Sequence, residues 1–286
     1  MALQSTPNHT QTVSGWAAHD SSGKIVLTSS NEVLYCGICH TDLHHVKNDW
    51  GITMYPVVPG HEITGVITKV GSNVKKFKIG NRVGVGCLVA SCLECEFCMN
   101  SQENYCDQIQ FTYNGIFWDG SITYGGYSTM LVADHRYVVN VPDNLPMDAA
   151  APLLCAGITA FGHHVTVIST SLSKEIEAKQ RLGADCFIVS TNDEQMQSGK
   201  RTLDVILDTA NGAPFFSINI RERAVKGSMT GSMKETQEML DVCGKHNITC
   251  DVELIKPDQI NQALDRLARN DVRYRFVIDI SGNSKH

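Results

Sequence analysis

The sequence contains no run of about 18 apolar residues, so no membrane-spanning helix is expected in it. It has no excess of basic residues either, because 24 Lys and Arg are outnumbered by 30 Asp and Glu and the formal net charge is −6. This balance argues against a nucleic-acid-binding surface. The polar N-terminus lacks the apolar stretch of a secretory signal. With 42% hydrophobic and 19% charged residues, the composition is that of a folded globular protein rather than a disordered one.

Cysteine, by contrast, is abundant, with 11 in 286 residues. Disulfides are rare in cytosolic proteins, and no export signal is visible, so these cysteines predict metal binding or catalysis. The expected location is the reducing environment of the cytoplasm.

The length predicts roughly two domains, and the sequence changes character near residue 145. Before that point, short β-branched runs alternate with Gly, Pro, Asn and Asp, which predicts a partly barrel-like, mostly antiparallel β region. From residue 148 onward, strands alternate with helices, which is typical of a parallel α/β sheet. The expected helices span residues 148–157, 173–182, 234–243 and 257–268. The expected strands of this part span residues 165–169, 186–190, 204–208 and 274–279.

Four cysteines lie close together in the sequence, at Cys92, Cys95, Cys98 and Cys106. Their spacing lets four thiolates surround one tetrahedral Zn²⁺, and a site with no open position is structural. An iron–sulfur cluster is an alternative, because Cys-x2-Cys-x2-Cys also occurs in ferredoxins, although no proline follows Cys106. The other alternative is a chance cluster of buried cysteines.

A second set of metal-ligand residues is spread along the chain. A catalytic zinc has about three protein ligands and one open position, and two cysteines with one histidine are a known set. Cys39, His61 and Cys155 can supply this set, with Glu62 as an occasional fourth ligand. Such a zinc acidifies an alcohol or polarises a carbonyl. Two alternatives remain open, since Cys36 and Cys39 can form a redox pair and Cys155 can be a buried core residue.

The sequence resembles the zinc-dependent medium-chain alcohol dehydrogenases of the plant cinnamyl alcohol dehydrogenase group. The segments that carry the likeness follow the family's order: CGICHTDLH (36–44), YPVVPGHEITG (55–65), the four-cysteine segment (92–106), TYGGYS (123–128), PLLCAGIT (152–159), GSMKETQEML (231–240) and DVRYRFVID (271–279). The resemblance implies an α/β protein with a GroES-like, β-rich catalytic domain in residues 1–158. It further implies a Rossmann-type, doubly wound parallel sheet in residues 159–230, a segment 231–286 that returns to the catalytic domain, and a homodimer.

The resemblance also assigns roles to single residues. Cys39, His61 and Cys155 match the ligands of the catalytic zinc, and Glu62 matches a carboxylate that exchanges with substrate. Thr41 matches the hydroxyl that takes the proton of the alcohol, and His44 matches the group that relays it toward solvent.

Two aromatic residues, Trp50 and Phe111, match positions that line the substrate pocket in relatives, and each can equally be a core residue. Asp42 is expected to accept the second N–H of the His61 imidazole, or else to cap a turn. His40 and His45 are expected at the surface without a role.

The implied cofactor is NADP, yet the sequence lacks the G-x-G-x-x-G turn of a dinucleotide-binding domain. The nearest match, at Gly84, lacks the third glycine and is interpreted as a strand with a bulge. Compared with the family, segments are missing after Thr159 and after Thr209, and residues 22–33 are shortened. Roughly half of the doubly wound domain is therefore expected to remain.

The segment after the strand at 165–169 still bears on cofactor choice. Ser169, Thr170, Ser171 and Lys174 offer hydroxyls and a cation, which suit the 2′-phosphate of NADP, where an NAD enzyme carries Asp or Glu. Ser and Thr are also favoured as helix N-caps, and both roles can coexist.

The predicted function is a zinc-dependent oxidoreductase that interconverts a primary allylic or aromatic alcohol, cinnamyl-type or monoterpenoid, and its aldehyde with NADP(H). The alternative is an inactive shortened isoform that retains zinc but has lost cofactor binding. A zinc hydrolase with Glu62 as its base is a weaker alternative, because it leaves Thr41 and His44 without a role.

Overall fold

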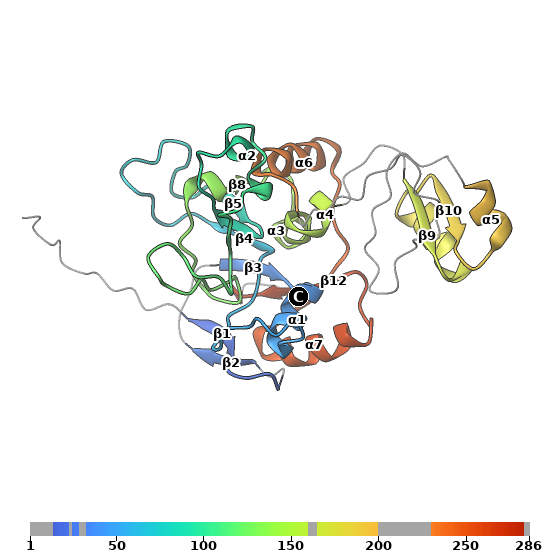
Figure 1. Cartoon of the computed structure of the whole chain (residues 1–286), viewed down its shortest axis with the longest axis horizontal. Helices are drawn as coiled ribbons and strands as arrows, with labels where there is room; N and C mark the ends of the chain where they lie inside the picture. The colour runs from blue at the N-terminus through green and yellow to red at the C-terminus, as the bar shows by residue number, and fades with distance from the viewer. Residues whose placement is uncertain (1–13, 23–24, 29–32, 160–164, 200–229, 283–286) are drawn as a thin grey trace, which may run out of the picture. The chain divides into compact units, whose positions relative to one another are not determined.

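The computed structural model describes residues 14–22, 25–28, 33–159, 165–199 and 230–282 (Figure 1). The chain divides into two compact units, one of residues 1–159 with 228–286 and one of residues 160–227. Every predicted zinc ligand lies in the larger unit, and the residues predicted to bind NADP lie in the smaller one.

A six-stranded sheet with the order β11-β12-β3-β4-β5-β8 forms the centre of the larger unit. Its strands are β3 (Val33–Gly37), β4 (Ile63–Val66), β5 (Arg82–Val85), β8 (Val139–Asn140), β11 (Val252–Ile255) and β12 (Arg275–Asp279). All neighbours are antiparallel except β11 and β12, which are parallel. Two separate antiparallel pairs consist of β1 (Gly15–Ala18) with β2 (Ile25–Thr28) and of β6 (Leu88–Ala90) with β7 (Gln110–Phe111). The prediction of a mostly antiparallel β region is confirmed.

The last strand of the chain completes this sheet. β12 pairs with β3, so that Ile278 lies opposite Cys36, and both side chains are fully buried. This pairing brings Arg275, at the start of β12, to the turn that follows β3, where its Nη1 donates to the carbonyl of Ile38 at 3.2 Å. A contact between residues so distant in sequence follows from the sheet order alone.

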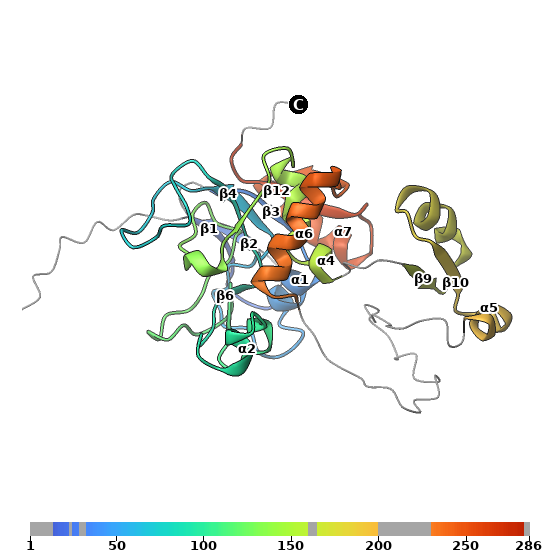
Figure 2. The ribbon, with the colours of Figure 1, turned by 90° about the horizontal axis from the view of Figure 1, so that it is seen from above.

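Helices lie on both sides of the sheet (Figure 1). The helices α1 (His40–Lys47) and α7 (Ile260–Ala268) contact each other, and α4 (Ala156–Thr159) contacts α6 (Met233–His246) (Figure 2). The buried side chains of α7 recur at the i, i+3, i+4, i+7 spacing of one helix face: Ile260, Ala263, Leu264 and Leu267. A capping box of Ser232 and Glu235 begins α6, and Asn247 ends it in the left-handed conformation. No helix in the described ranges is long and apolar enough to cross a membrane.

The single helix predicted for residues 148–157 is wrong. Instead, α3 (Met147–Ala150) passes into a 3-10 turn at Ala151–Leu154, and α4 begins at Ala156. Pro152 has no N–H to continue the α-helical hydrogen bonding and fits the first positions of a new turn. Cys155, at the break, has φ −127° and ψ −74°, so the interruption gives this residue a backbone conformation outside the helix.

Gly84 is part of a strand, β5, as expected, and Gly86 follows its end, but the expected bulge is absent. β5 pairs with β4 in a regular register, in which Gly84 lies opposite Thr64. A Cβ at Gly84 would come within 2.9 Å of the side chain of Leu154. The glycine therefore permits close packing of the strand against the 3-10 turn.

The smaller unit contains a two-stranded parallel pair of β9 (Thr166–Ser169) and β10 (Cys186–Val189). This confirms the parallel pairing predicted for these strands. The helix predicted for residues 173–182 is confirmed: residues 172–181 are continuously helical, beginning as a 3-10 turn at Leu172–Lys174 and ending as a π-helical turn at Glu177–Arg181, and Gly183 follows at φ +74°. Beyond β10, α5 spans Asp193–Ser198. The strand predicted at 204–208 and the gap after residue 209 lie outside the described residues.

Candidate metal centre and active site

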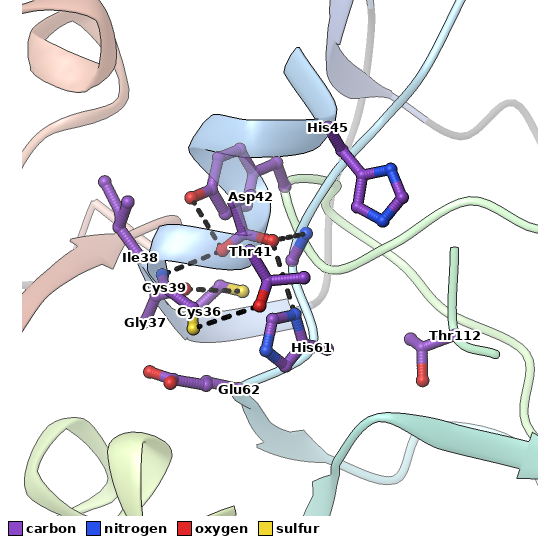
Figure 3. A network of polar contacts seen from close by, with 12 residues as sticks. Cys36, Gly37, Ile38, Cys39, Thr41, Asp42, His45, His61, Glu62 and Thr112 are labelled. Atoms are coloured by element: carbon purple, nitrogen blue, oxygen red, sulfur yellow. Dashed lines mark hydrogen bonds and ion pairs between the residues drawn. The ribbon is translucent and has the colours of Figure 1, made fainter. Parts of the chain in front are cut away.

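The turn between β3 and α1 places Cys39, the first predicted ligand, at the N-cap of the helix (Figure 3). Its backbone N–H donates to Asp42 Oδ2 at 2.9 Å. An acidic side chain is favoured in the first helical turn because it faces the positive end of the helix dipole. The sulfur of Cys39 lies 3.6 Å from Thr41 Oγ1. The helix start thus fixes a thiol and a hydroxyl side by side.

The segment before β4 supplies His61. Gly60 precedes it at φ +107°, and a Cβ there would lie 2.6 Å from the Tyr127 ring, so only glycine fits. The Gly60 N–H donates to Asp42 Oδ1 at 3.0 Å, and His61 Nδ1 lies 3.3 Å from the same oxygen. Asp42 is fully buried and also accepts the Tyr127 hydroxyl at 3.3 Å. One carboxylate thereby joins both ligand segments and faces Nδ1 of the imidazole, which leaves Nε2 for a metal.

Glu62 is completely buried, and neither of its carboxylate oxygens has a hydrogen-bond donor among the described residues. Arg275 Nη2 forms an ion pair with Oε1 at 3.2 Å. Burial raises the pKa of Glu62 to about 8, although the charge of Arg275 opposes this shift. A Cβ at Gly37 would lie 2.0 Å from Glu62 Oε2, so this glycine makes room for the carboxylate. A buried carboxylate with unused acceptor capacity requires a cation or a proton.

The ligand atoms of Cys39, His61, Glu62 and Cys155 all lie within 4.8 Å of one another. Two thiols, an imidazole and a carboxylate form a donor set that suits Zn²⁺, so these residues fit the catalytic metal expected for them. The Cys155 thiol and the neighbouring His61 lower the pKa of Cys39 well below its usual value. A low thiol pKa favours the thiolate, which is the form that binds metal.

The redox-pair alternative for Cys36 and Cys39 is not supported. Cys36 is fully buried in β3, and its thiol donates to the Gly37 carbonyl at 3.6 Å. All eleven cysteines of the chain are free thiols.

Two polar side chains flank the cluster on α1. Thr41 is half-buried beside Cys39, and His44 is one turn further along the helix. His44 Nδ1 lies 2.8 Å from Asp49 Oδ2, with side-chain exposures of 27% and 45%. The ring of Trp50, which is 50% exposed, lies 5.1 Å from the His44 ring. His44 is therefore in a position to exchange protons with water.

The surface position expected for His45 is wrong. Its ring is half-buried, edge-on to Trp50 at 5.0 Å and to Tyr113 at 5.1 Å, and burial lowers its pKa. Phe111, the other predicted substrate residue, lies in β7 against the small apolar cluster that includes Leu88 and Tyr137.

The four cysteines of residues 92–106 form the second ligand cluster, with all four sulfurs within 4.8 Å of one another. The Cys92–Cys98 sulfur distance is 3.9 Å, and the Cys95–Cys98 and Cys92–Cys106 distances are 3.5 Å. A tetrahedral site with Zn–S bonds of about 2.3 Å has edges of about 3.8 Å. The sulfurs therefore fit one ion, whereas in an iron–sulfur cluster the cysteines are divided among several irons. Backbone N–H groups of Glu94 and Cys95 lower the pKa of Cys92 to about 7, which favours the thiolate.

The residues predicted to bind the NADP 2′-phosphate lie at the carboxyl end of β9. Ser169 is the last strand residue, Thr170 follows it, and Lys174 ends the 3-10 turn with an exposed side chain. Ser171 Oγ accepts the N–H of Ser173 at 3.2 Å, which is the alternative N-cap role. Hydroxyls and a cation are thus present at the expected edge of the strand pair.

The group of Cys39, His61, Glu62 and Cys155 is called the open cluster below. Four residues near it have no pattern in the local sequence that would predict their contacts: Cys87, Asp49, Tyr127 and Arg275. The pKa of Cys87 is lowered to about 5 by a hydrogen bond with Cys155 and by the nearby His61, which places this thiol beside the cluster. Tyr127 and Arg275 lie in segments that carry the family resemblance, but only their partners in space, Asp42 and Glu62, reveal what they do.

Comparison with known proteins gives one consistent result. Residues 17–143 match the family model of the alcohol dehydrogenase GroES-like domain. The chain is 55% identical to a probable cinnamyl alcohol dehydrogenase 6 of Oryza sativa subsp. japonica, over 99% of this chain and 100% of that relative. It is 43% identical to the 8-hydroxygeraniol dehydrogenase of Catharanthus roseus, over 100% of this chain and 99% of the relative.

Solved structures agree with these relatives. A cinnamyl alcohol dehydrogenase of Sorghum bicolor has a TM-score of 0.87 and 40% identity, with 96% of this chain and 99% of that chain covered. A cinnamyl alcohol dehydrogenase of Helicobacter pylori complexed with NADP(H) has a TM-score of 0.75 and 30% identity, with 95% and 99% covered.

The alignment with the Oryza relative also shows where the chains differ in content. It extends over 359 residues, whereas this chain has 286, so at least 73 positions within the alignment have no counterpart here. A loss of this size agrees with the missing glycine-rich turn and its flanking elements. The chain belongs to the zinc-dependent medium-chain alcohol dehydrogenases, in the group of the plant cinnamyl alcohol dehydrogenases.

Proposed function

We propose that this chain interconverts a primary allylic or aromatic alcohol, of cinnamyl or monoterpenoid type, and its aldehyde with NADP(H). The observation that carries the proposal is the cluster of Cys39, His61, Glu62 and Cys155, whose donor atoms lie within 4.8 Å of one another. The names of the Oryza and Catharanthus relatives support the substrate class. The half-exposed ring of Trp50, beside His44, offers an apolar face for a conjugated substrate.

The two ligand clusters support the proposal of two zinc ions per chain. The four-cysteine cluster has no open position and suits structural zinc, whereas the other cluster would hold the catalytic zinc through Cys39, His61 and Cys155. When bound there, Zn²⁺ supplies Lewis-acid polarisation of the substrate oxygen. Glu62 is the exchangeable carboxylate, because its oxygens accept no hydrogen bond from the described residues and only Arg275 holds it from behind.

Thr41 and His44 transfer the hydroxyl proton of the alcohol to solvent. The Thr41 hydroxyl can accept a proton and donate one at the same time, and it lies next to the ligand Cys39. His44 exchanges the proton with solvent, because its side chain is 27% exposed and an imidazole nitrogen can accept or donate a proton. The Asp49 carboxylate, 2.8 Å from His44 Nδ1, orients this ring.

NADP, when bound, supplies the hydride-accepting nicotinamide, and we assign its 2′-phosphate to Ser169, Thr170, Ser171 and Lys174. The absence of a glycine-rich turn supports the second candidate function, an inactive shortened isoform that retains zinc but does not bind the cofactor. By family resemblance, we also propose a homodimer in the cytoplasm, for which light scattering of the purified chain gives the mass.

The decisive experiment combines metal analysis with an NADPH fluorescence titration and turnover of cinnamyl alcohol and geraniol. A full-length relative serves as the positive control. Two zinc ions with NADPH binding and turnover support the oxidoreductase. Two zinc ions without any NADPH binding support the inactive isoform, and a single zinc ion contradicts both.

A further inference from the structure

The buried Tyr127 contacts the open cluster indirectly, through Asp42, which lies beside the ligand His61. The Tyr127 hydroxyl donates to Asp42 Oδ2 at 3.3 Å, and Asp42 Oδ1 lies 3.3 Å from His61 Nδ1. Neither Tyr127 nor Asp42 has exposed surface. In water-free surroundings, each hydrogen bond to a carboxylate strongly restricts where that carboxylate can lie. Tyr127 therefore acts on the imidazole through Asp42.

The four-cysteine cluster has the same arrangement with different residues. The Tyr137 hydroxyl donates to Ser91 Oγ at 2.6 Å, and Ser91 Oγ lies 3.0 Å from Cys98 Sγ. Tyr137 and Ser91 are both buried. Because Ser91 Oγ accepts a hydrogen bond from the Tyr137 hydroxyl, the Ser91 hydroxyl can donate its own hydrogen to the sulfur of Cys98. A thiolate bound to a metal is stabilised by such a donor.

The backbone fixes both tyrosines before any metal is considered. The Tyr127 N–H donates to the Pro59 carbonyl at 2.9 Å, which ties its segment to the one that carries His61. Tyr137 ends a 3-10 turn, and its ring packs against Leu88 of β6. The hydroxyls are therefore held in place by sheet and turn contacts independent of the ligands.

We propose that Tyr127 and Tyr137 are positioning residues, each for one metal site: Tyr127 holds Asp42 against His61, and Tyr137 directs Ser91 toward Cys98. The inference rests on the proposed function, since it requires both clusters to bind metal. Neither tyrosine touches the metal.

A third buried tyrosine provides a matched control. Tyr113 stacks on His61 with ring centroids 5.8 Å apart, yet its hydroxyl is buried without a hydrogen-bond partner in the described part of the chain. Removing this hydroxyl deletes the same atom as in the other two variants. Like the Tyr127 hydroxyl it lies near Asp42 and His61, but it forms no hydrogen bond of regular geometry with a described residue, so its loss is expected to disturb Asp42 less. Any effect common to all three variants is then a general effect of losing a buried hydroxyl.

The experiment compares Tyr127→Phe, Tyr137→Phe and Tyr113→Phe in the full chain loaded with zinc. Zinc release to a chromogenic chelator is followed over time, and its two phases are assigned with His61→Ala and Cys95→Ser. We expect Tyr127→Phe to accelerate only release from the open cluster and Tyr137→Phe only release from the four-cysteine cluster, each by about 10-fold or more. Tyr113→Phe is expected to change neither phase.

Cobalt absorption and a double variant add two independent measurements. In the Co²⁺-loaded chain, Tyr127→Phe is expected to shift the visible bands of the open cluster, because the imidazole orientation changes, and to leave the other cluster's bands unchanged. Ser91→Ala is expected to mimic Tyr137→Phe, and the double variant is expected to release zinc no faster than either single variant.

The inference is overturned if the Tyr127 and Tyr137 variants accelerate both phases alike, or neither, or if Tyr113→Phe matches Tyr127→Phe. Failure of the proposed function looks different. In that case the wild-type chain itself shows no metal at the open cluster, while the Tyr137 pair is still tested at the four-cysteine cluster.

Discussion

The larger unit of the chain brings predicted metal ligands from separate segments within 4.8 Å of one another, whereas the sheet in the described part of the smaller unit has only two strands, β9 and β10. The difference lies in how each function depends on its sheet. The predicted ligands Cys39 and His61 lie in turns next to β3 and β4 of the mostly antiparallel sheet. The C-terminal strand β12 pairs with β3 in the same sheet. All of these parts are present in the chain.

The cofactor site depends instead on a single central element. In a doubly wound sheet of order 3-2-1-4-5-6, the first strand is central, and the glycine-rich turn at its end holds the pyrophosphate. The sequence passes from Thr159 almost directly to the segment of β9, so this strand and turn are missing. The chain thus keeps both clusters of predicted zinc ligands while it lacks the glycine-rich turn of the nucleotide site.

Replacing the imidazole ligand tests the larger unit most directly. In His61→Ala, the cluster of Cys39, His61, Glu62 and Cys155 loses its imidazole ligand, and only two thiols and a carboxylate remain to hold an ion. We expect one zinc ion per chain instead of two, with no measurable alcohol turnover. Elemental analysis gives the metal count, and Cys95→Ser, which should remove the other ion, is the matched variant. Two ions retained in His61→Ala would contradict the assignment of this cluster.

Removing the Thr41 hydroxyl separates proton transfer from metal binding. The Thr41 side chain lies 3.6 Å from the Cys39 sulfur but is not a ligand, so Thr41→Ala should keep both zinc ions. Loss of a positioned acid–base group costs about 10²–10⁴-fold in turnover. The measurement is kcat with the metal content determined on the same sample, and Thr41→Ser, which keeps the hydroxyl, is expected to restore most of the activity. Normal turnover in Thr41→Ala would exclude this hydroxyl from the mechanism.

The NADPH titration measures how much cofactor affinity the smaller unit has lost relative to an intact relative. Without the glycine-rich turn, the backbone N–H groups that normally bind the pyrophosphate are gone, and hydrogen bonds to charged groups contribute about 1.5–3 kcal/mol each. Two such losses correspond to an increase in Kd of about 100-fold or more relative to an intact relative. Affinity equal to that of the relative would remove the contrast between the units. In the opposite direction, complete absence of binding would make the chain the inactive isoform.

Gly37 leaves the space that the Glu62 carboxylate occupies, and filling this space is expected to have a modest effect. In Gly37→Ala, the new methyl group would lie 2.0 Å from Glu62 Oε2, so the carboxylate or the β3 backbone must move. Overpacking of this kind costs about 1–3 kcal/mol of folding free energy, and we expect weaker zinc binding at the open cluster alone. Urea unfolding and the zinc release rate are the measurements. Gly71→Ala is the control, because its nearest neighbour would be 3.8 Å away, and equal behaviour of the two variants would refute the role given to Gly37.

The sequence predicts best what depends on short-range spacing. The four-cysteine cluster was accessible because its ligands lie within one loop, where spacing alone brings the thiols together. The parallel pairing of β9 and β10 followed from the alternation of strand and helix. The open cluster was harder, because Cys39, His61 and Cys155 are far apart in the chain. Their residue types suggested a catalytic zinc set but left other roles open, and the family resemblance then favoured the zinc set.

The errors have identifiable physical causes. The helix expected over residues 148–157 ignored the missing N–H of Pro152, and the resulting break lies next to the ligand Cys155. His45 looks like a surface residue by its polarity, yet Trp50 and Tyr113 pack on its ring. The bulge expected at Gly84 is absent, because the glycine serves close packing against Leu154.

By itself the sequence determined the family, the two sets of metal ligands and the loss of the glycine-rich turn, since each is written in residue types and short spacings. Only the tertiary structure decided which groups support the ligands: Arg275 behind Glu62, Tyr127 behind Asp42 and Tyr137 behind Ser91. These partners come from distant segments, and hydrogen bonds between them depend on sheet order and close approach of backbones. Such contacts are made by the packing of the whole unit, so no local pattern of residues encodes them.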